Sequence, residues 1–197
     1  CLDACPTGAF AAPYVLDARR CIAYLTIEHR GWIPRELRAS IGTRVFGCDE
    51  CQRVCPFNAS AQARPVMEEL GRRADGRDLS LGISLESLLF LTNRQHKKLV
   101  RHSALRRASC AQLSRNAAVA LGNTGDPRAL PLLQRALRTH PNAIVRGHAA
   151  WALGRLGLAA AEVELKRAAQ QDVDSRVRDE AAAASGNFPR IESLFPP

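Results

Sequence analysis

The chain has 197 residues, of which 46% are hydrophobic, 24% charged and 5% aromatic, and 28 basic residues against 19 acidic ones give a net charge of +9. This composition suits about one to two globular domains with a buried core, and the basic excess favours a polyanionic partner. A membrane-spanning helix is excluded and no membrane partner is expected, because no segment approaches the roughly 20 consecutive apolar residues of a transmembrane helix. No signal or transit peptide is recognisable after Cys1, so we expect a cytoplasmic protein whose sequence starts inside a longer chain.

The first 55 residues hold six of the seven cysteines. Two stretches, Cys1-x3-Cys5-Pro6 and Cys48-x2-Cys51-x3-Cys55-Pro56, are endings of the run C-x2-C-x2-C-x3-C-P, which binds [4Fe–4S] clusters. In that run three thiolates surround one cluster, and the last cysteine with its proline reaches toward a second cluster. The spacing therefore predicts iron–sulfur clusters rather than an extracellular disulfide scaffold.

Zinc is the alternative metal, because zinc ribbons also bind through C-x2-C knuckles. Such ribbons use two knuckles, whereas this sequence has one, at Cys48 and Cys51, followed by the x3 step. The spacing favours iron and sulfide over zinc.

The ligands of the clusters can be assigned by counting thiols. The second run lacks its first cysteine, because Val45 stands at that place, and the spare thiol nearby is Cys21, with 26 residues between it and Cys48. We expect one cluster on Cys5, Cys21, Cys48 and Cys51, and a second on Cys1, Cys55 and two cysteines outside this sequence. Residues 22–47 would then be held at both ends by the first cluster.

Residues 65–91 are predicted to connect the cysteine region, residues 1–64, to the rest of the chain. We expect a short helix near residues 65–67 and a polar loop with glycines at 71–82. A short apolar helix at 85–91 is expected to pack the two parts together.

A basic interval follows this connection. No acidic residue occurs between Ser87 and Gly125, an interval that contains seven basic residues: Arg94, Lys97, Lys98, Arg101, Arg106, Arg107 and Arg115. Residues 99–107 are predicted to form a helix with exposed arginines. Such an interval is typical of a nucleic-acid-binding surface, although a solvated helix face would have the same composition.

The last part of the chain, residues 92–197, contains internal repeats. Residues 115–122, 146–154 and 178–186 resemble one another, and the offsets between Arg115, Arg146 and Arg178 are 31 and 32 residues. Amphipathic helices are predicted to follow at 129–137 and 161–169. A repeated helix pair of this period indicates a short HEAT-like solenoid. Its helices are predicted to stop at the glycines of each copy: Gly122, Gly154 and Gly186.

The predicted fold class is therefore mainly α, with a ferredoxin-like double [4Fe–4S] region followed by a short HEAT-like α-helical solenoid. This combination resembles the epoxyqueuosine reductases. The resemblance covers essentially the whole chain and rests on the following segments: CLDACPTGA (1–9), CIAYLTIEHRG (21–31), GCDECQRVCP (47–56), SALRR (103–107) and RNAAVALGN (115–123). The sequence departs from the family at His96 and Val100, where phenylalanine is more frequent, and at His102, where glycine is.

The resemblance implies a chemistry and a set of partners. It implies that cobalamin, supplied with electrons by the clusters, reduces epoxyqueuosine to queuosine at the wobble base of tRNA. The implied partners are the tRNA anticodon stem-loop and an electron donor such as a flavodoxin or a ferredoxin, with the protein acting as a monomer. The proton donor and most of the cobalamin pocket are expected in a domain upstream, so no catalytic residue is expected in this chain, and the chain alone is expected to be inactive.

The resemblance also assigns candidate site residues by position. Near the corrin it places Ala23, Cys48 and Asp49. On a substrate-facing loop it places Glu28, His29 and Gly31. For tRNA phosphates it supplies the candidates Arg94, Lys97, Lys98, Arg106 and Arg107.

Simpler interpretations apply to some of these residues and their neighbours. Glu28 could instead pair with Arg30. Trp32 and Trp151 are expected to be packing residues, and Cys110, which lies outside the cluster spacing, an inert thiol.

Two other functions remain open. One is a ferredoxin-type electron-transfer module of another corrinoid enzyme, which would need neither the repeats nor the basic interval. The other is a non-catalytic HEAT-repeat scaffold with a structural metal.

Overall fold

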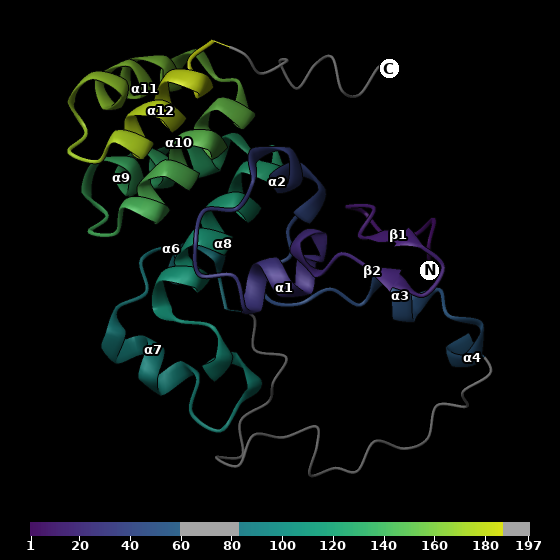
Figure 1. Cartoon of the computed structure of the whole chain (residues 1–197). Coiled ribbons are helices and arrows are strands. Elements are labelled where there is room, and N and C mark those ends of the chain that lie inside the picture. The colour runs from purple at the N-terminus through teal and green to yellow at the C-terminus, as the bar shows by residue number, and fades with distance from the viewer. Residues whose placement is uncertain (60–82, 187–197) are drawn as a thin grey trace.

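The computed structural model describes residues 1–59 and 83–186, and its regular structure is almost entirely helical, as predicted. Figure 1 shows the helical repeats at one end of the molecule, the amino-terminal hairpin with α3 and α4 at the other, and α1, α2 and α8 between them. None of the described helices is long and apolar enough to cross a membrane. The predicted helix near 65–67 and loop at 71–82 lie outside the described residues.

The cysteine region consists of short elements. Strands β1 (Phe10–Ala12) and β2 (Val15–Leu16) form an antiparallel hairpin, and Tyr14 in its turn has a φ of 65°. The helical elements that follow are η1 (Ala18–Arg20), α1 (Ile22–Ile27), α2 (Arg35–Ile41), α3 (Glu50–Arg53) and α4 (Pro56–Ala59). Elements this short cannot bury a core by themselves, so they depend on packing against the repeats.

The helical part begins with α6 (Leu85–Leu89), α7 (Asn93–Leu99) and the 3-10 helix η2 (Ala104–Arg107). Two helix pairs and a final helix follow as predicted: α8 (Cys110–Thr124) with α9 (Leu130–Thr139) after η3 (Pro127–Ala129), α10 (Ala143–Leu156) with α11 (Ala159–Gln171), and α12 (Ser175–Ala184). Side-chain oxygens cap the inner helices of the three copies, from Ser109, Asn142 and Asp174. These caps explain why each inner helix begins where it does.

One hydrophobic core joins the cysteine region to the repeats. Ile22, Leu25 and Ile41 of α1 and α2 belong to the same buried cluster as the alanines and leucines of α8 and α10. Leu88 and Leu89 of α6 are also buried in this cluster, and α6 packs on α8, which confirms the predicted role of the short apolar helix. Trp32 and Trp151 both pack on or within the core, as expected.

Two predicted helix stops are wrong. Gly122 and Gly154 lie inside α8 and α10, which end at left-handed Gly125 and Gly157. The reason is packing: a Cβ on Gly122 would lie 2.7 Å from the Cβ of Ala152, so glycine there allows α8 and α10 to approach closely. Gly186 does follow the end of α12.

The predicted helix at 99–107 is also wrong. Helix α7 ends at Leu99, and His102 has a φ of 58° in the left-handed region. The hydroxyl of Ser103 then accepts the N–H of Leu105 and starts η2. A serine that binds its own backbone competes with helix continuation, which divides the segment in two.

The segment between Cys21 and Cys48 is held by polar side chains of α8. The fully buried Arg115 guanidinium donates to the carbonyls of Leu25, His29 and Gly31, each at 2.7 Å. The side-chain amide of Asn116 donates to Thr26 and Val45, and that of Gln112 donates to Ile27 and His29. Burial, with a smaller contribution from Arg38, lowers the pKa of Arg115 to about 10, so the side chain stays charged at neutral pH.

A second group of polar contacts holds the remainder of the segment. Arg38 is buried and forms two hydrogen bonds of 2.8 Å with the carboxylate of Glu180 on α12. His148 of α10 accepts the N–H of Ile33 through Nε2 and donates from Nδ1 to Ile144. Burial holds the pKa of His148 well below its usual value, so the ring is neutral, as this pair of contacts requires.

The close approach at Gly122 gives a first prediction. Gly122→Ala should destabilise the chain by about 1–3 kcal/mol, because the new methyl group meets helix α10 and forces it to move. The matched control is Gly186→Ala, where nothing lies within 4 Å of the new Cβ. Urea denaturation of both variants checks this, and equal free energies of unfolding would contradict it.

The buried guanidinium gives a second prediction. Arg115→Met should destabilise the chain by about 3–5 kcal/mol, because the buried carbonyls of Leu25 and Gly31 lose the side-chain donor of Arg115 and that of His29 keeps only Gln112. That loss corresponds to a fall in the midpoint of thermal unfolding of about 2–4 °C per kcal/mol. Arg128→Met, at a side chain that is 91% exposed, is the control and should change stability by less than about 0.5 kcal/mol. A similar midpoint for both variants would show that other groups satisfy the carbonyls.

Candidate functional site

The cysteines lie on turns and at the ends of short helices. Cys5 precedes a tight turn, Cys21 immediately precedes α1, Cys48 lies just before α3, and Cys51 lies within α3. All six cysteines of this region are free thiols, Cys1 exposed and the others partly buried. Such positions leave the sulfur atoms available to a metal group at the protein surface.

Hydrogen bonds between neighbouring residues connect three of these cysteines. Arg20, next to Cys21, donates from Nε and Nη2 to the carbonyl of Thr7, at 3.0 and 2.8 Å, two residues after Cys5. Thr26, on the helix that follows Cys21, accepts the N–H of Gly47, at 3.0 Å, one residue before Cys48. The segments that carry Cys5, Cys21 and Cys48 are thereby joined to one another.

Cys5 lies in a turn that stabilises its thiolate. The N–H of Ala9 donates to Sγ at 3.3 Å, and the hydroxyl of Thr7 lies 3.6 Å from it. Burial acts to raise the pKa of Cys5, but the hydrogen bonds from Ala9, Thr7 and Gly8 outweigh it, and the pKa is lowered. The thiolate is the form that binds metals, so the environment suits a ligand.

The donor set fits an iron–sulfur cluster, because cysteine thiolates are the ligands of such clusters. It also fits zinc in its chemistry. Within residues 1–59 and 83–186, no three histidine, cysteine, aspartate or glutamate side chains lie close enough to hold a single metal ion.

The candidates for the corrin and the substrate lie along the same segment. Ala23 is partly buried on α1, whereas Asp49 is exposed at the start of α3 and accepts a hydrogen bond from Gln52. The imidazole of His29 lies 3.0 Å from the carbonyl of Trp32 through Nε2, so its ring folds back on its own loop. Gly31 is held through its carbonyl by Arg115.

Glu28 forms an ion pair with Arg107 rather than with Arg30. Both side chains are largely exposed, so the pair contributes little to stability, about 0–1 kcal/mol. The ion pair instead shows that η2 lies directly beside the segment between Cys21 and Cys48. The two sets of predicted RNA-facing residues therefore meet at this contact.

The predicted tRNA-contact side chains are all exposed: Arg94, Lys97 and Lys98 on α7, and Arg106 and Arg107 on η2. Arg115 does not belong to this surface, since it is fully buried. Counting it among the surface charges of the basic interval was wrong, because charge along a sequence does not reveal which side chain is buried. The one local indication was a charged and a polar residue, Arg115 and Asn116, followed by a run of alanine, valine and leucine.

Other residues that sequence reasoning missed act as anchors. Gln112 and Asn123 hold backbone carbonyls of the cysteine region, at Ile27, His29, Arg38 and Gly42. Both lie on α8, and nothing in the local sequence pattern marks them. Cys110 donates its S–H to the carbonyl of Leu91 at 2.9 Å, and burial raises the pKa of its thiol, which agrees with an inert cysteine.

Comparisons with known protein families agree with both halves of the chain. Residues 1–58 match the family model of the 4Fe-4S double cluster binding domain, and residues 99–186 match that of HEAT repeats. The predicted fold class is thereby confirmed.

Individual relatives are similar over most of this chain. The epoxyqueuosine reductase of Pseudomonas aeruginosa is 46% identical over 150 residues, which is 75% of this chain and 40% of the relative. A crystal structure of selenomethionine-labelled epoxyqueuosine reductase superposes with a TM-score of 0.83 at 36% identity, covering 94% of this chain and 48% of the other. The crystal structure of an epoxyqueuosine reductase with an epoxyqueuosine-modified tRNA-Tyr stem loop superposes with a TM-score of 0.77, at 36% identity and the same coverage.

The chain spans less than half the length of these relatives. Within that length, the same order of a cysteine region and helical repeats is matched in sequence and in three dimensions. The chain is therefore similar, in sequence and in fold, to part of the epoxyqueuosine reductases.

Proposed function

We propose that this chain is the C-terminal, cluster-bearing and tRNA-binding part of an epoxyqueuosine reductase, which reduces epoxyqueuosine to queuosine at the wobble base. The observation that carries the proposal is the set of hydrogen bonds from α8 to residues 22–47, which we call the cysteine segment. Through the ion pair of Glu28 with Arg107, this segment lies beside the exposed basic side chains of α7 and η2, which we call the basic surface. A solved relative of the same fold is bound to a tRNA stem loop. We further propose a cytoplasmic monomer that receives electrons from a flavodoxin or a ferredoxin.

Cys5, Cys21, Cys48 and Cys51 would hold one [4Fe–4S] cluster, and Cys1 and Cys55 would hold another together with two cysteines from outside this sequence. The support for the first set is the hydrogen bonding of Arg20 to Thr7 and of Gly47 to Thr26, which joins three of its segments. The lowered pKa of Cys5 favours the same assignment.

Ala23, Cys48 and Asp49 are this chain's proposed share of the wall around a corrin. When bound, the clusters and cobalamin supply the electrons for a two-electron removal of the epoxide oxygen. The chain's own residues position the substrate loop: Arg115 and Gln112 fix the carbonyls of His29 and its neighbours, which sets where Glu28, His29 and Gly31 lie. The modified base would have to leave the anticodon stack to reach this loop.

The basic surface would hold the tRNA by its phosphates. Arg94, Lys97 and Lys98 stand free of carboxylates among the described residues, whereas Arg107 already pairs with Glu28. A phosphate that engages Arg107 would replace a weak surface ion pair, which costs little. Binding of this kind weakens steeply with salt, because it releases counterions from the RNA.

The cluster assignment predicts the metal content. After anaerobic purification the chain should carry about four irons and four sulfides, with an EPR signal on reduction, and Cys21→Ala should lose most of this iron. Cys110→Ala is the control and should keep it, because Cys110 binds the carbonyl of Leu91 instead. Full iron in Cys21→Ala would contradict the assignment. Zinc without sulfide would favour the structural-metal scaffold.

The basic surface predicts a salt-dependent affinity. Replacing Arg106 and Arg107 together with alanine should weaken tRNA binding and reduce the steepness of log affinity against log salt by about 1.4–1.8, roughly 0.7–0.9 for each lost phosphate contact. The matched control replaces Arg138 and Arg167, which are also partly exposed and pair with Glu164. Filter binding at several salt concentrations measures both. Equal slopes for the two double variants would exclude η2 from the interface and favour the electron-transfer or scaffold alternatives.

A further inference from the structure

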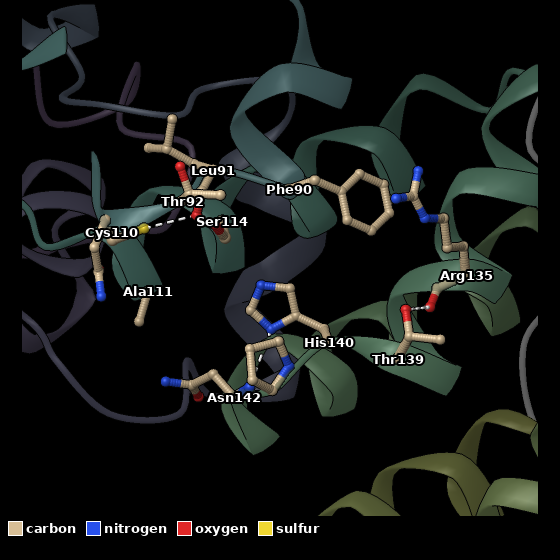
Figure 2. A pocket seen from close by; sticks show the side chains of 12 residues that line it. Phe90, Leu91, Thr92, Cys110, Ala111, Ser114, Arg135, Thr139, His140 and Asn142 are labelled. Atoms are coloured by element: carbon tan, nitrogen blue, oxygen red, sulfur yellow. Dashed lines mark hydrogen bonds between the residues drawn. The ribbon is translucent and has the colours of Figure 1, made fainter. Parts of the chain in front are cut away.

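A cavity of about 640 Å³ lies between the start of α7 and the junction of α9 with α10, and no residue of the described cysteine region, 1–59, lines it. Figure 2 shows its lining: Phe90 and Arg135 lie on one side and Cys110 on the other. His140 lies between the pair Phe90 and Arg135 and the side chain of Asn142. The wall brings together residues 90–93, 110–114 and 135–142, which are distant in the sequence. Nothing proposed so far for the cysteine segment or the basic surface uses this space.

On one side of the cavity a cation lies over an aromatic ring. The guanidinium of Arg135 lies over the ring of Phe90, 4.2 Å from its centroid. No carboxylate lines the cavity. Among the described residues, no carboxylate forms an ion pair with Arg135. The outer face of the guanidinium and its N–H groups are therefore available to a planar or anionic group.

Another part of the wall carries hydrogen-bond donors. Nδ1 of His140 accepts the N–H of Asn142 at 3.1 Å, and burial lowers the pKa of this imidazole, so the neutral ring carries its proton on Nε2. Asn142 turns its carbonyl oxygen to the N–H of Ile144 at 2.9 Å, which leaves its NH2 group as a donor. Three kinds of donor thus border the cavity without a carboxylate to occupy them.

A cation over an aromatic ring, in one cavity with neutral donors, matches the chemistry of a nucleotide. Unpaired bases stack on aromatic rings and on guanidinium planes, and their carbonyls and phosphates accept hydrogen bonds. The cavity also adjoins the basic surface, because Asn93 in its wall begins α7, the helix that exposes Arg94, Lys97 and Lys98. An RNA lying on α7 would pass the opening.

We infer that this cavity receives one unpaired nucleotide of the bound RNA, its base stacked on the Arg135–Phe90 pair and its acceptors facing His140 and Asn142. The inference rests on the proposed function, because it assumes that RNA lies along α7. It adds a second recognition point, distinct from the loop that faces the modified base.

The test compares two RNAs by fluorescence anisotropy, a stem loop with unpaired nucleotides and a fully paired duplex of the same length. The wild-type chain should prefer the stem loop. Arg135→Ala should weaken stem-loop binding about tenfold (about 1.4 kcal/mol) and duplex binding far less. Arg128→Ala removes an equal charge from an exposed side chain outside the cavity and should leave the preference intact.

A second variant separates stacking from charge. Phe90→Leu keeps an apolar side chain, and its loss of the preference for the stem loop, with an unchanged melting temperature, would support the inference. Equal losses for both RNAs in Arg135→Ala, or no loss, would overturn it. No salt-sensitive binding of either RNA by the wild type would overturn the proposed function itself. Displacement of a fluorescent nucleotide by adenosine monophosphate without any stem-loop binding would overturn RNA as the source of the nucleotide.

Discussion

One buried guanidinium joins the two halves of this chain. Arg115 stands on the inner helix of the first repeat, yet its hydrogen bonds go to carbonyls of the cysteine segment. A charge can be buried at acceptable cost only when its donors are satisfied, and here three backbone carbonyls and the side-chain oxygen of Asn116 accept them. Helix α8 therefore serves both as part of the solenoid and as the support for residues 22–47. The positions of the cysteines, the basic surface and the cavity relative to one another depend on this helix.

The arginine at the position of Arg115 has a structural role in the other two repeat copies as well. Arg146 and Arg178 occupy the same repeat position as Arg115, and each donates to a carbonyl six residues earlier, of His140 and of Asp172. Their task is to hold the turn that precedes their own helix. In the first copy the same side chain points to a different backbone, that of the cysteine segment. The solenoid thus binds residues 22–47, which are not part of any repeat, through an arginine that each repeat copy contains.

Local patterns predicted much of this structure, and they failed where distant segments meet. Cysteine spacing indicated the metal-binding region and the offset between copies indicated the helix pairs, because both signals lie within a few turns of chain. The sequence could not tell that Gly122 serves a helix crossing rather than a helix end, since the partner, Ala152, is 30 residues away. The same holds for the burial of Arg115 and for the cavity, whose wall combines three separate parts of the chain. The break between α7 and η2 was not predicted either, because it includes a left-handed residue, His102, that is not a glycine.

The anchors on α8 recognise main chain rather than side chains. Arg115, Asn116, Gln112 and Asn123 all donate to carbonyl oxygens of the cysteine region, and every amino acid offers such an oxygen. Residues 22–26 and 33–41 also depend on their own buried side chains, such as Leu25 and Arg38, but the course of the loop 27–31 is fixed largely through its main-chain carbonyls. Substitutions there could retune what the loop contacts while its backbone keeps the same course. The arrangement separates the evolution of selectivity from the maintenance of shape.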